Sequence, residues 1–159
     1  MKETGMMSAT SKAQVLRIAT ARINHKAASD ERVLDITRKS ASEEVGRLMA
    51  PEWRMVLDLK EERIDWATYT GQYQDLLRKR YARYAQAFHD LIRDVVAGRE
   101  RLVLTCYCNV GPDCNHCHRF LMADILEKIA RQEGYDVSRE DDLSRNKAPE
   151  TSPQLPLGF

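Results

Sequence analysis

The residues whose types suit chemistry lie close together in the second half of the chain. All four cysteines fall within residues 106–117, at Cys106, Cys108, Cys114 and Cys117. A secreted protein that relies on disulfides spreads its cysteines along the chain, whereas clustered cysteines indicate reduced thiols, a bound metal or a reactive site. The sequence therefore predicts one functional centre in this segment.

The run Cys117-His118-Arg119 comes directly before an apolar repeat with helical spacing, so we expect it to open a helix. The N–H groups at a helix N-terminus favour anions, and the Arg119 guanidinium can bind phosphate or carboxylate through two parallel hydrogen bonds. The same field would lower the pKa of Cys117 and make it a candidate catalytic nucleophile, with His118 as proton donor or acceptor. The alternative is structural: Cys106 and Cys117 are small buried residues, and Arg119 pairs with a nearby acid.

A bound metal is the second interpretation of the same segment. Its four cysteines, with His116 and His118 interleaved, offer more thiolate and imidazole ligands than a tetrahedral zinc requires. Cys-x-Cys followed by Cys-x-x-Cys resembles some compact zinc and iron–sulfur loops, although Cys106 is expected inside a strand rather than in the loop. Zinc is the candidate cofactor, and a cluster of reduced thiols without metal is the alternative. The predicted metal ligands are Cys108, Cys114, His116 and Cys117.

Short apolar runs rich in β-branched residues predict the strands that position these groups. They are residues 15–19, 33–37 and 102–106, and the last is typical of a strand buried in a parallel sheet. Strands that alternate with helices predict an α/β fold, here a small three-layer Rossmann-like domain with a mostly parallel sheet and a flexible C-terminal tail. Ligands in such folds bind at the carboxyl ends of strands, where Cys106 is placed.

Helices are expected between these strands. Apolar residues recur every three or four positions over residues 65–97, which predicts a long amphipathic helix with a break at Gly71 and a cap at Gly98. Shorter helices are predicted near Glu43 and from Pro51, which suits the first position of a helix. The helix that follows Cys117 should end at Gly134.

The composition limits the classes of protein to consider. A chain of 159 residues fits one domain, and its net charge of +1 provides no global field for nucleic acid, so a role on DNA needs a local patch or a partner. No apolar run approaches the roughly 18 residues that span a bilayer, and the first residues lack the apolar core of a signal peptide. We therefore expect a cytoplasmic protein that is not embedded in a membrane.

The end of the chain differs in composition from the α/β domain predicted for residues 1–137. Residues 138–153 are rich in charge and proline and predict a flexible linker. Residues 154–159 turn apolar again and resemble the hexapeptide by which bacterial polymerases and repair proteins dock on the replication sliding clamp. The residues predicted to bind the clamp are Gln154, Leu155, Leu157 and Phe159.

The expected contacts of this tail follow from its side chains. Gln154 can hydrogen-bond at the rim of a pocket, while Leu157 and Phe159 fill an apolar groove. The bacterial DNA polymerase sliding clamp is therefore the predicted partner. The alternative is that the tail folds back on its own domain or dimerises.

Several of these segments together resemble the bacterial and phage family catalogued as domain of unknown function 488. Its members carry a strand that ends in Cys, similar to Leu104-Thr105-Cys106-Tyr107-Cys108, and then Cys-His-Arg at a helix start, similar to residues 117–119. An upstream strand that ends in Asp-x-x-Arg is similar to Asp35-Ile36-Thr37-Arg38. The middle section around Ala50-Pro51-Glu52 and the region of Tyr69 and Tyr73 is also similar.

The resemblance covers residues 15–137 and implies an α/β fold with one pocket. The longer loop at residues 109–116 departs from the family and adds Cys114 and His116. Around the pocket, the resemblance and the adjacent polar residues place a substrate-binding group that consists of Asp35, Arg38, Lys39, Ser40 and Cys106, beside the catalytic candidates Cys117, His118 and Arg119.

Two functions follow from these features. The first is an enzyme or ligand-binding domain that acts on a phosphate-bearing substrate, a nucleotide or DNA, and is recruited to the sliding clamp by its tail. The second is a non-catalytic clamp-binding adaptor or inhibitor, in which the cysteines form a structural metal site. Both hypotheses share the tail and differ in the role of the cysteines.

Overall fold

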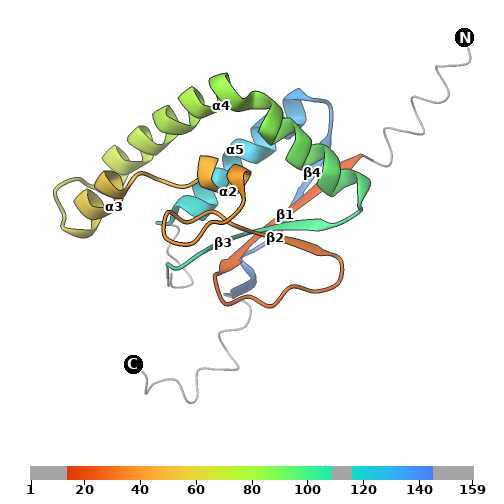
Figure 1. Cartoon of the computed structure of the whole chain (residues 1–159), viewed down its shortest axis with the longest axis horizontal. Helices are drawn as coiled ribbons and strands as arrows, with labels where there is room; N and C mark the ends of the chain where they lie inside the picture. Colours follow the sequence, from red (N-terminus) through yellow and green to blue (C-terminus); the bar gives the residue numbers. More distant parts are fainter. Residues whose placement is uncertain (1–13, 109–115, 145–159) are drawn as a thin grey trace, which may run out of the picture.

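One parallel sheet organises the protein (Figure 1). The computed structural model describes residues 14–108 and 116–144. Within them the strands run in the spatial order β2-β3-β1-β4, and every neighbouring pair is parallel. The predicted α/β class with a parallel sheet is confirmed. The strands are β1 (Val15–Arg22), β2 (Glu31–Asp35), β3 (Arg101–Cys106) and β4 (Asp136–Arg139).

The register of the sheet aligns the ends of its three longest strands. Cys106 at the end of β3 pairs with Arg22 at the end of β1, and Thr105 pairs with Asp35 at the end of β2. Neighbouring parallel strands end at the same edge, so the segments that follow β1, β2 and β3 meet there. This edge carries the candidate site.

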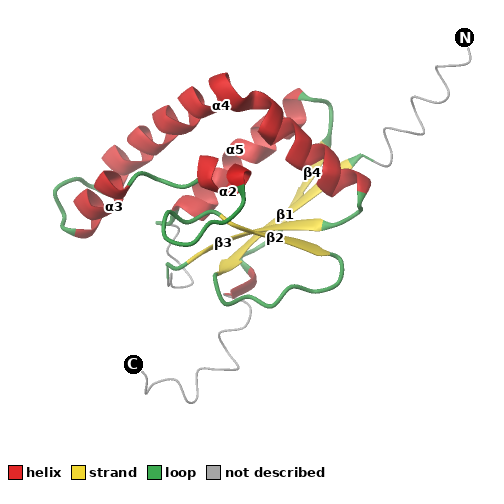
Figure 2. Cartoon of the chain, in the orientation of Figure 1, coloured by secondary structure: helices red, strands yellow, loops and turns green. Residues whose placement is uncertain are grey.

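The helices cover one face of the sheet, as Figure 2 shows for α4 and α5. Leu16, Ile18 and Leu104 point from the strands into the apolar core below these helices. On the opposite face Ala19 and Val103 belong to a smaller apolar cluster that packs against Val33 and Leu143, and residues 143–144 are helical. The helices are α2 (Glu44–Leu48), α3 (Trp53–Lys60), α4 (Trp66–Ala97) and α5 (His118–Gln132).

Helix α4 confirms the long amphipathic repeat but not the predicted break. Asp65 caps its start, where the carboxylate accepts a hydrogen bond from the Thr68 N–H at 2.8 Å. The helix continues through Gly71, since one exposed glycine costs only about 1 kcal/mol relative to alanine. Its backbone leaves helical values at Tyr84 instead (φ −124°, ψ 34°). Gly98 forms the C-cap as predicted.

Two predicted boundaries at helix ends can be compared with the structure. Pro51 is not the first residue of α3, because Glu52 is the N-cap and Trp53 begins the helix. Helix α5 ends at Gln132, and Gly134 follows with a φ of +93°, a conformation that glycine adopts without strain. The prediction that Gly134 ends this helix is therefore confirmed.

The flexible linker predicted from residue 138 begins too early. Strand β4 extends to Arg139, and its backbone pairs with β1. Asp142 is buried, and Leu143 packs against the sheet. The folded domain therefore continues at least to residue 144, while residues 145–159, with the predicted clamp peptide, lie outside the described part of the chain. Of the helices in residues 14–108 and 116–144, none is long and apolar enough to cross a bilayer.

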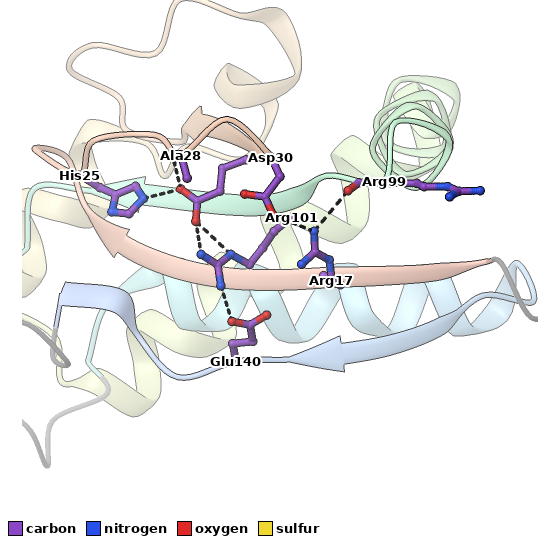
Figure 3. A network of polar contacts seen from close by, with 8 residues as sticks. Arg17, His25, Ala28, Asp30, Arg99, Arg101 and Glu140 are labelled. Atoms are coloured by element: carbon purple, nitrogen blue, oxygen red, sulfur yellow. Dashed lines mark hydrogen bonds and ion pairs between the residues drawn. The ribbon is translucent and has the colours of Figure 1, made fainter.

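A charged network ties the strands together on the face opposite the helices (Figure 3). The carboxylate of Glu31 accepts hydrogen bonds from Arg101 and from the Ala28 N–H, and it contacts His25 Nε2 at 2.8 Å. Arg101 also donates to Glu140 at 2.5 Å. Because Glu140 follows β4, the network joins β2 and β3 to the segment beyond the fourth strand.

Candidate functional site

Three of the four cysteines meet at the carboxyl edge of the sheet. Cys106 is the last residue of β3, Cys108 follows two residues later, and Cys117 is the N-cap of α5. Their sulfur atoms all lie within 4.8 Å of one another, and the Sγ atoms of Cys106 and Cys108 are 3.6 Å apart. Cys106 and Cys117 are buried, whereas Cys108 is exposed. The parallel fold therefore brings together residues that the sequence separates by a loop.

The three thiols differ in how readily they ionise. The pKa of Cys108 is lowered to about 2, because the Cys106 and Cys117 thiols donate hydrogen bonds to its sulfur. Hydrogen bonding to Cys108 raises the pKa of Cys106 to about 11, and hydrogen bonding to its two neighbours raises that of Cys117 well above its usual value. The lowered pKa predicted for Cys117 is therefore wrong. The helix start matters less there than burial and the neighbouring sulfurs.

His118 is a buried neutral imidazole held in one orientation. Its Nε2 lies 2.8 Å from the Ile36 carbonyl oxygen, which can only accept, so this nitrogen carries the proton. Nδ1 is then unprotonated and faces the Cys106 sulfur at 3.7 Å. Burial lowers the pKa of His118, which favours the neutral ring. The geometry suits a proton acceptor for Cys106 rather than for Cys117.

Arg119 is turned away from solvent. Its Nε and Nη2 atoms donate to the two oxygens of Asp142 at 3.0 and 3.2 Å. Its Nη1 donates to the Cys108 carbonyl oxygen at 3.0 Å and to the Cys117 sulfur at 3.7 Å. The Arg119 side chain pairs with a nearby acid, as expected if its role is structural. Its guanidinium therefore contacts the cysteine residues and Asp142 instead of binding an anion.

The loop after β2 carries the other predicted substrate-binding residues. Asp35 Oδ1 accepts hydrogen bonds from the Thr37 N–H and hydroxyl at 2.9 and 2.7 Å, and Asp35 Oδ2 accepts one from Ser40. Tyr107 donates to the Ser40 hydroxyl at 3.0 Å. Asp35 and Ser40 thus shape the loop and connect it to the residue between two of the cysteines.

A cavity of about 500 Å³ opens in front of the cysteines. All three cysteines line it, and Arg38, Lys39 and Lys60 bring positive charge to its wall. Its aromatic lining consists of Trp53, Trp66, Tyr69, Tyr107, His116 and His118. Arg38, Lys39 and Cys106 are therefore at the predicted pocket, whereas Arg119 is absent from the described residues that line it.

Trp53, Trp66 and Lys60 line the cavity although the sequence does not single them out. The helical repeat over residues 65–97 includes Trp66, whose ring stacks on His116 with centroids 4.7 Å apart and planes 16° apart. Trp53 is 49% exposed, and exposure cannot be deduced from spacing. One sequence feature could have indicated this wall: α3 and α4 each begin with a tryptophan. Lys60 is the last residue of α3.

Contacts from α4 hold the cavity wall in place. The Tyr73 hydroxyl donates to the Met49 carbonyl oxygen at 2.6 Å, and Arg80 Nη1 donates to the carbonyl oxygens of Leu48 and Ala50 at 2.9 and 2.6 Å. These bonds satisfy carbonyl groups at the end of α2 that the helix leaves free. The start of α3, which bears Trp53, is fixed as a result.

The metal ligands predicted from the sequence are regrouped in the structure. Cys108 and Cys117 join Cys106 in the one group of potential ligands found among the described residues. His116 stacks on Trp66 instead of joining that group, and Cys114 lies outside the described residues. The cluster that could hold a metal such as zinc is therefore the three-cysteine set.

The fold and the site define a parallel α/β domain with a cysteine centre at the edge where such domains bind ligands. The chain belongs to the DUF488-N3a family, described as the active DUF488-N3 subclade, whose model matches residues 4–130. This confirms the resemblance to the domain of unknown function 488 family. No curated protein and no solved structure matches the chain. Strand β4 and Asp142 follow the matched segment.

Proposed function

We propose that this protein is an enzyme that binds a nucleotide in the cavity in front of Cys106, Cys108 and Cys117. The observation that carries the proposal is the lining of that cavity, which combines stacked aromatic rings, cationic side chains and thiols. Its volume of about 500 Å³ lies in the range of small-molecule sites. A free nucleotide or a single nucleotide turned out of a strand suits it better than a duplex.

The aromatic residues supply a surface for the base. The Trp66 ring stacks with those of His116 and Tyr69, with centroid separations of 4.7 and 5.2 Å. Stacking of a base on such rings contributes about 1–3 kcal/mol, whatever the base. Trp53 adds an exposed indole on the same cavity.

The cations supply the partner for the phosphate. Arg38 and Lys39 follow β2, and Lys60 reaches the cavity from α3. The Lys39 ammonium lies 5.0 Å from the centroid of the Tyr107 ring, which places it beside the residue between Cys106 and Cys108. With a net charge of only +1 for the chain, the attraction for phosphate is local to this wall.

The thiols supply the reactive groups nearest to the bound nucleotide, and the description of the family as an active subclade supports an enzyme. His118 Nδ1, 3.7 Å from the Cys106 sulfur, adds a proton acceptor at the floor of the cavity. We also propose that the protein acts in DNA metabolism. This part of the proposal depends on the resemblance of residues 154–159 to a clamp-binding peptide.

Tryptophan fluorescence tests the binding step directly, because Trp53 and Trp66 are the two tryptophans of the chain and both line the cavity. Titration with adenosine and guanosine mono-, di- and triphosphates should quench it, and the nucleosides without phosphate should bind at least tenfold more weakly. Trp66→Ala and Lys39→Ala should each weaken binding about tenfold, in the range of one stacked base or one charged contact.

Lys79→Ala is the matched control, since this exposed lysine lies on α4 and outside the cavity lining. It should bind nucleotides like the unaltered protein. Absence of quenching by every nucleotide, or equal affinity of Trp66→Ala, would contradict the proposal.

A non-catalytic clamp-binding adaptor or inhibitor is the second candidate function. The spacing of Gln154, Leu155, Leu157 and Phe159 supports it, and a zinc ion in the cysteine cluster would then serve the fold. The full chain should retain a bacterial sliding clamp in a pull-down, and Leu157→Ala combined with Phe159→Ala should release it. Unchanged retention by the double variant would rule out this use of the tail.

A further inference from the structure

We propose that Cys106, Cys108 and Cys117 form a three-thiolate site for one thiophilic divalent cation, with zinc as the first candidate, whose fourth coordination position opens into the cavity. Binding of the ion follows from the geometry of the cysteines alone. The further step, that a group of the nucleotide takes the fourth position, rests on the proposed function.

The spacing of the sulfur atoms fits such an ion. With Zn–S bonds of about 2.3 Å in a tetrahedron, two sulfur ligands lie about 3.8 Å apart. The Cys106 and Cys108 sulfurs are 3.6 Å apart, and no pair in the cluster exceeds 4.8 Å. Small side-chain rotations therefore suffice to bring all three onto one ion.

The backbone holds these ligands before an ion arrives. Cys106 is fixed by the register of β3 against Arg22 of β1, and Cys117 by its position at the start of α5. The carbonyl group of Cys108 accepts a hydrogen bond from Arg119 at 3.0 Å. Two of the three ligands therefore lie at the end of a strand and the start of a helix, so they lose little conformational freedom when the ion binds.

Arg119 provides the support that a cluster of thiolates needs. Three thiolates and one divalent cation carry a net charge of −1, and the positive charge of the Arg119 guanidinium, itself paired with Asp142, lies beside them. Its Nη1 also donates to the Cys117 sulfur at 3.7 Å, and Asp142 fixes its plane from the other side. Such outer contacts orient the ligands of metal sites and tune their affinity.

The direction of the open position distinguishes this site from a structural zinc. Structural sites are closed by four protein ligands, whereas sites that act on a substrate keep three protein ligands and an open position. All three cysteines line the cavity with the aromatic and cationic side chains. The fourth position then lies where the proposed nucleotide binds, and a base nitrogen or a phosphate oxygen can occupy it.

Cobalt(II) gives the most direct test, because it replaces zinc in such sites and reports its ligands by absorption. The full chain, reduced and freed of metal, is titrated with Co²⁺ and then with Zn²⁺. We expect one Co²⁺ per chain, a sulfur-to-cobalt charge-transfer band in the near ultraviolet, visible bands of tetrahedral cobalt, and displacement by one equivalent of Zn²⁺. Absence of the charge-transfer band would overturn the proposal.

Variants separate the ligands from their surroundings. Cys108→Ser, at an exposed position that need not affect folding, should weaken Co²⁺ binding more than 100-fold, and Asp142→Asn about tenfold through Arg119. Circular dichroism of each variant establishes that it is folded. Equal affinity of Cys108→Ser would remove this cysteine from the site and overturn the three-thiolate set.

Cys114→Ser tests whether the fourth position is open. The visible cobalt bands should stay unchanged in this variant and should shift when a nucleotide is added to the cobalt-loaded protein. Loss of binding in Cys114→Ser would show a site closed by four cysteines and overturn the open position.

Quenching by nucleotides is measured in parallel on the same samples. Quenching without Co²⁺ binding would overturn the metal site and leave the proposed function standing. Co²⁺ binding without quenching would leave the three-thiolate site standing and overturn the proposed function, together with the nucleotide at the fourth position.

Discussion

Arg119 and Asp142 form an ion pair whose side chains are both completely buried, with Nε and Oδ1 3.0 Å apart. Asp142 also accepts a hydrogen bond from the Thr20 hydroxyl at 2.7 Å, so the segment after β4 is tied to β1 and α5 together. The same guanidinium reaches the Cys108 carbonyl oxygen and the Cys117 sulfur. The last described segment of the chain therefore helps to position the cysteine centre.

Removal of the acid from this pair should destabilise the protein strongly. Asp142→Ala leaves the Arg119 guanidinium buried without its carboxylate, and loss of one partner of a buried pair costs about 3–5 kcal/mol. Urea unfolding followed by circular dichroism measures the change. Asp141→Ala, at the exposed neighbouring position, should stay within about 0.5 kcal/mol of the unaltered protein. Similar losses in both variants would show that Asp142 contributes no more than a surface residue.

The burial of Asp142 and its pairing with Arg119 cannot be predicted from the sequence. Residues 138–144 are polar and charged, and such a stretch predicts a solvated linker. Asp142 is buried because its partner Arg119, 23 residues earlier, lies opposite it in the fold. The same pairing decides the orientation of Arg119. A partner of this kind cannot be deduced from spacing, since it depends on the order of β1 and β4 in the sheet.

The placement of the cysteines can be predicted from the sequence more readily. An apolar run that ends at Cys106 and a helical repeat that begins after Cys117 each predict an element from local residues, and parallel topology then brings the two ends together. The stacked aromatic side chains of the cavity wall cannot be predicted in this way, because periodicity identifies α4 without telling which of its aromatic side chains faces a cavity. The stacking of Trp66 on His116 is known only from the structure.

Two glycines that lie inside helices should respond in opposite directions to alanine. A Cβ at Gly46 in α2 would overlap the carbonyl oxygen of Asp35, a backbone atom that cannot move aside. Gly46→Ala should therefore cost at least about 1–3 kcal/mol and displace the loop at Thr37. Gly71→Ala meets nothing within 4 Å in the middle of a helix and should stabilise the protein by about 1 kcal/mol.

Thermal and urea unfolding of both glycine variants check these signs. The comparison is internal, because each variant adds the same methyl group to a helical residue. A stable Gly46→Ala protein would mean that α2 can move away from β2 at little cost.

The Tyr73 hydroxyl should contribute to the stability of the cavity wall. Tyr73→Phe leaves the Met49 carbonyl oxygen without its buried donor, which costs about 1–3 kcal/mol. The measured quantity is the free energy of unfolding in urea. Tyr84→Phe, at a ring that is 40% exposed, should change it by less than about 0.5 kcal/mol. An equal effect of the two substitutions would contradict the importance of the Met49 contact.

Glu31 should make the stability of the fold depend on pH in the acid range. Burial opposes its charge, but hydrogen bonds from Ala28, Arg101 and His25 outweigh that effect and lower the pKa of Glu31 from 4.5 to about 2 (Figure 3). A carboxyl group whose pKa is lower in the folded state stabilises the fold above its unfolded pKa. This contribution is lost as the pH falls from about 4.5 to about 2.

The variant Glu31→Gln removes the charge at every pH. At pH 7 it should cost about 1.5–3 kcal/mol, the range for hydrogen bonds to charged groups, and the difference from the unaltered protein should shrink from pH 4.5 downwards and nearly vanish at about pH 2. Asp30→Asn is the neighbouring control, because its carboxylate is 61% exposed and lies 3.5 Å from Arg17. A surface pair of this kind contributes less than about 1 kcal/mol. Urea midpoints between pH 2 and pH 7 measure both series, and a constant difference for Glu31→Gln across that range would show that its pKa is the same in the folded and unfolded states.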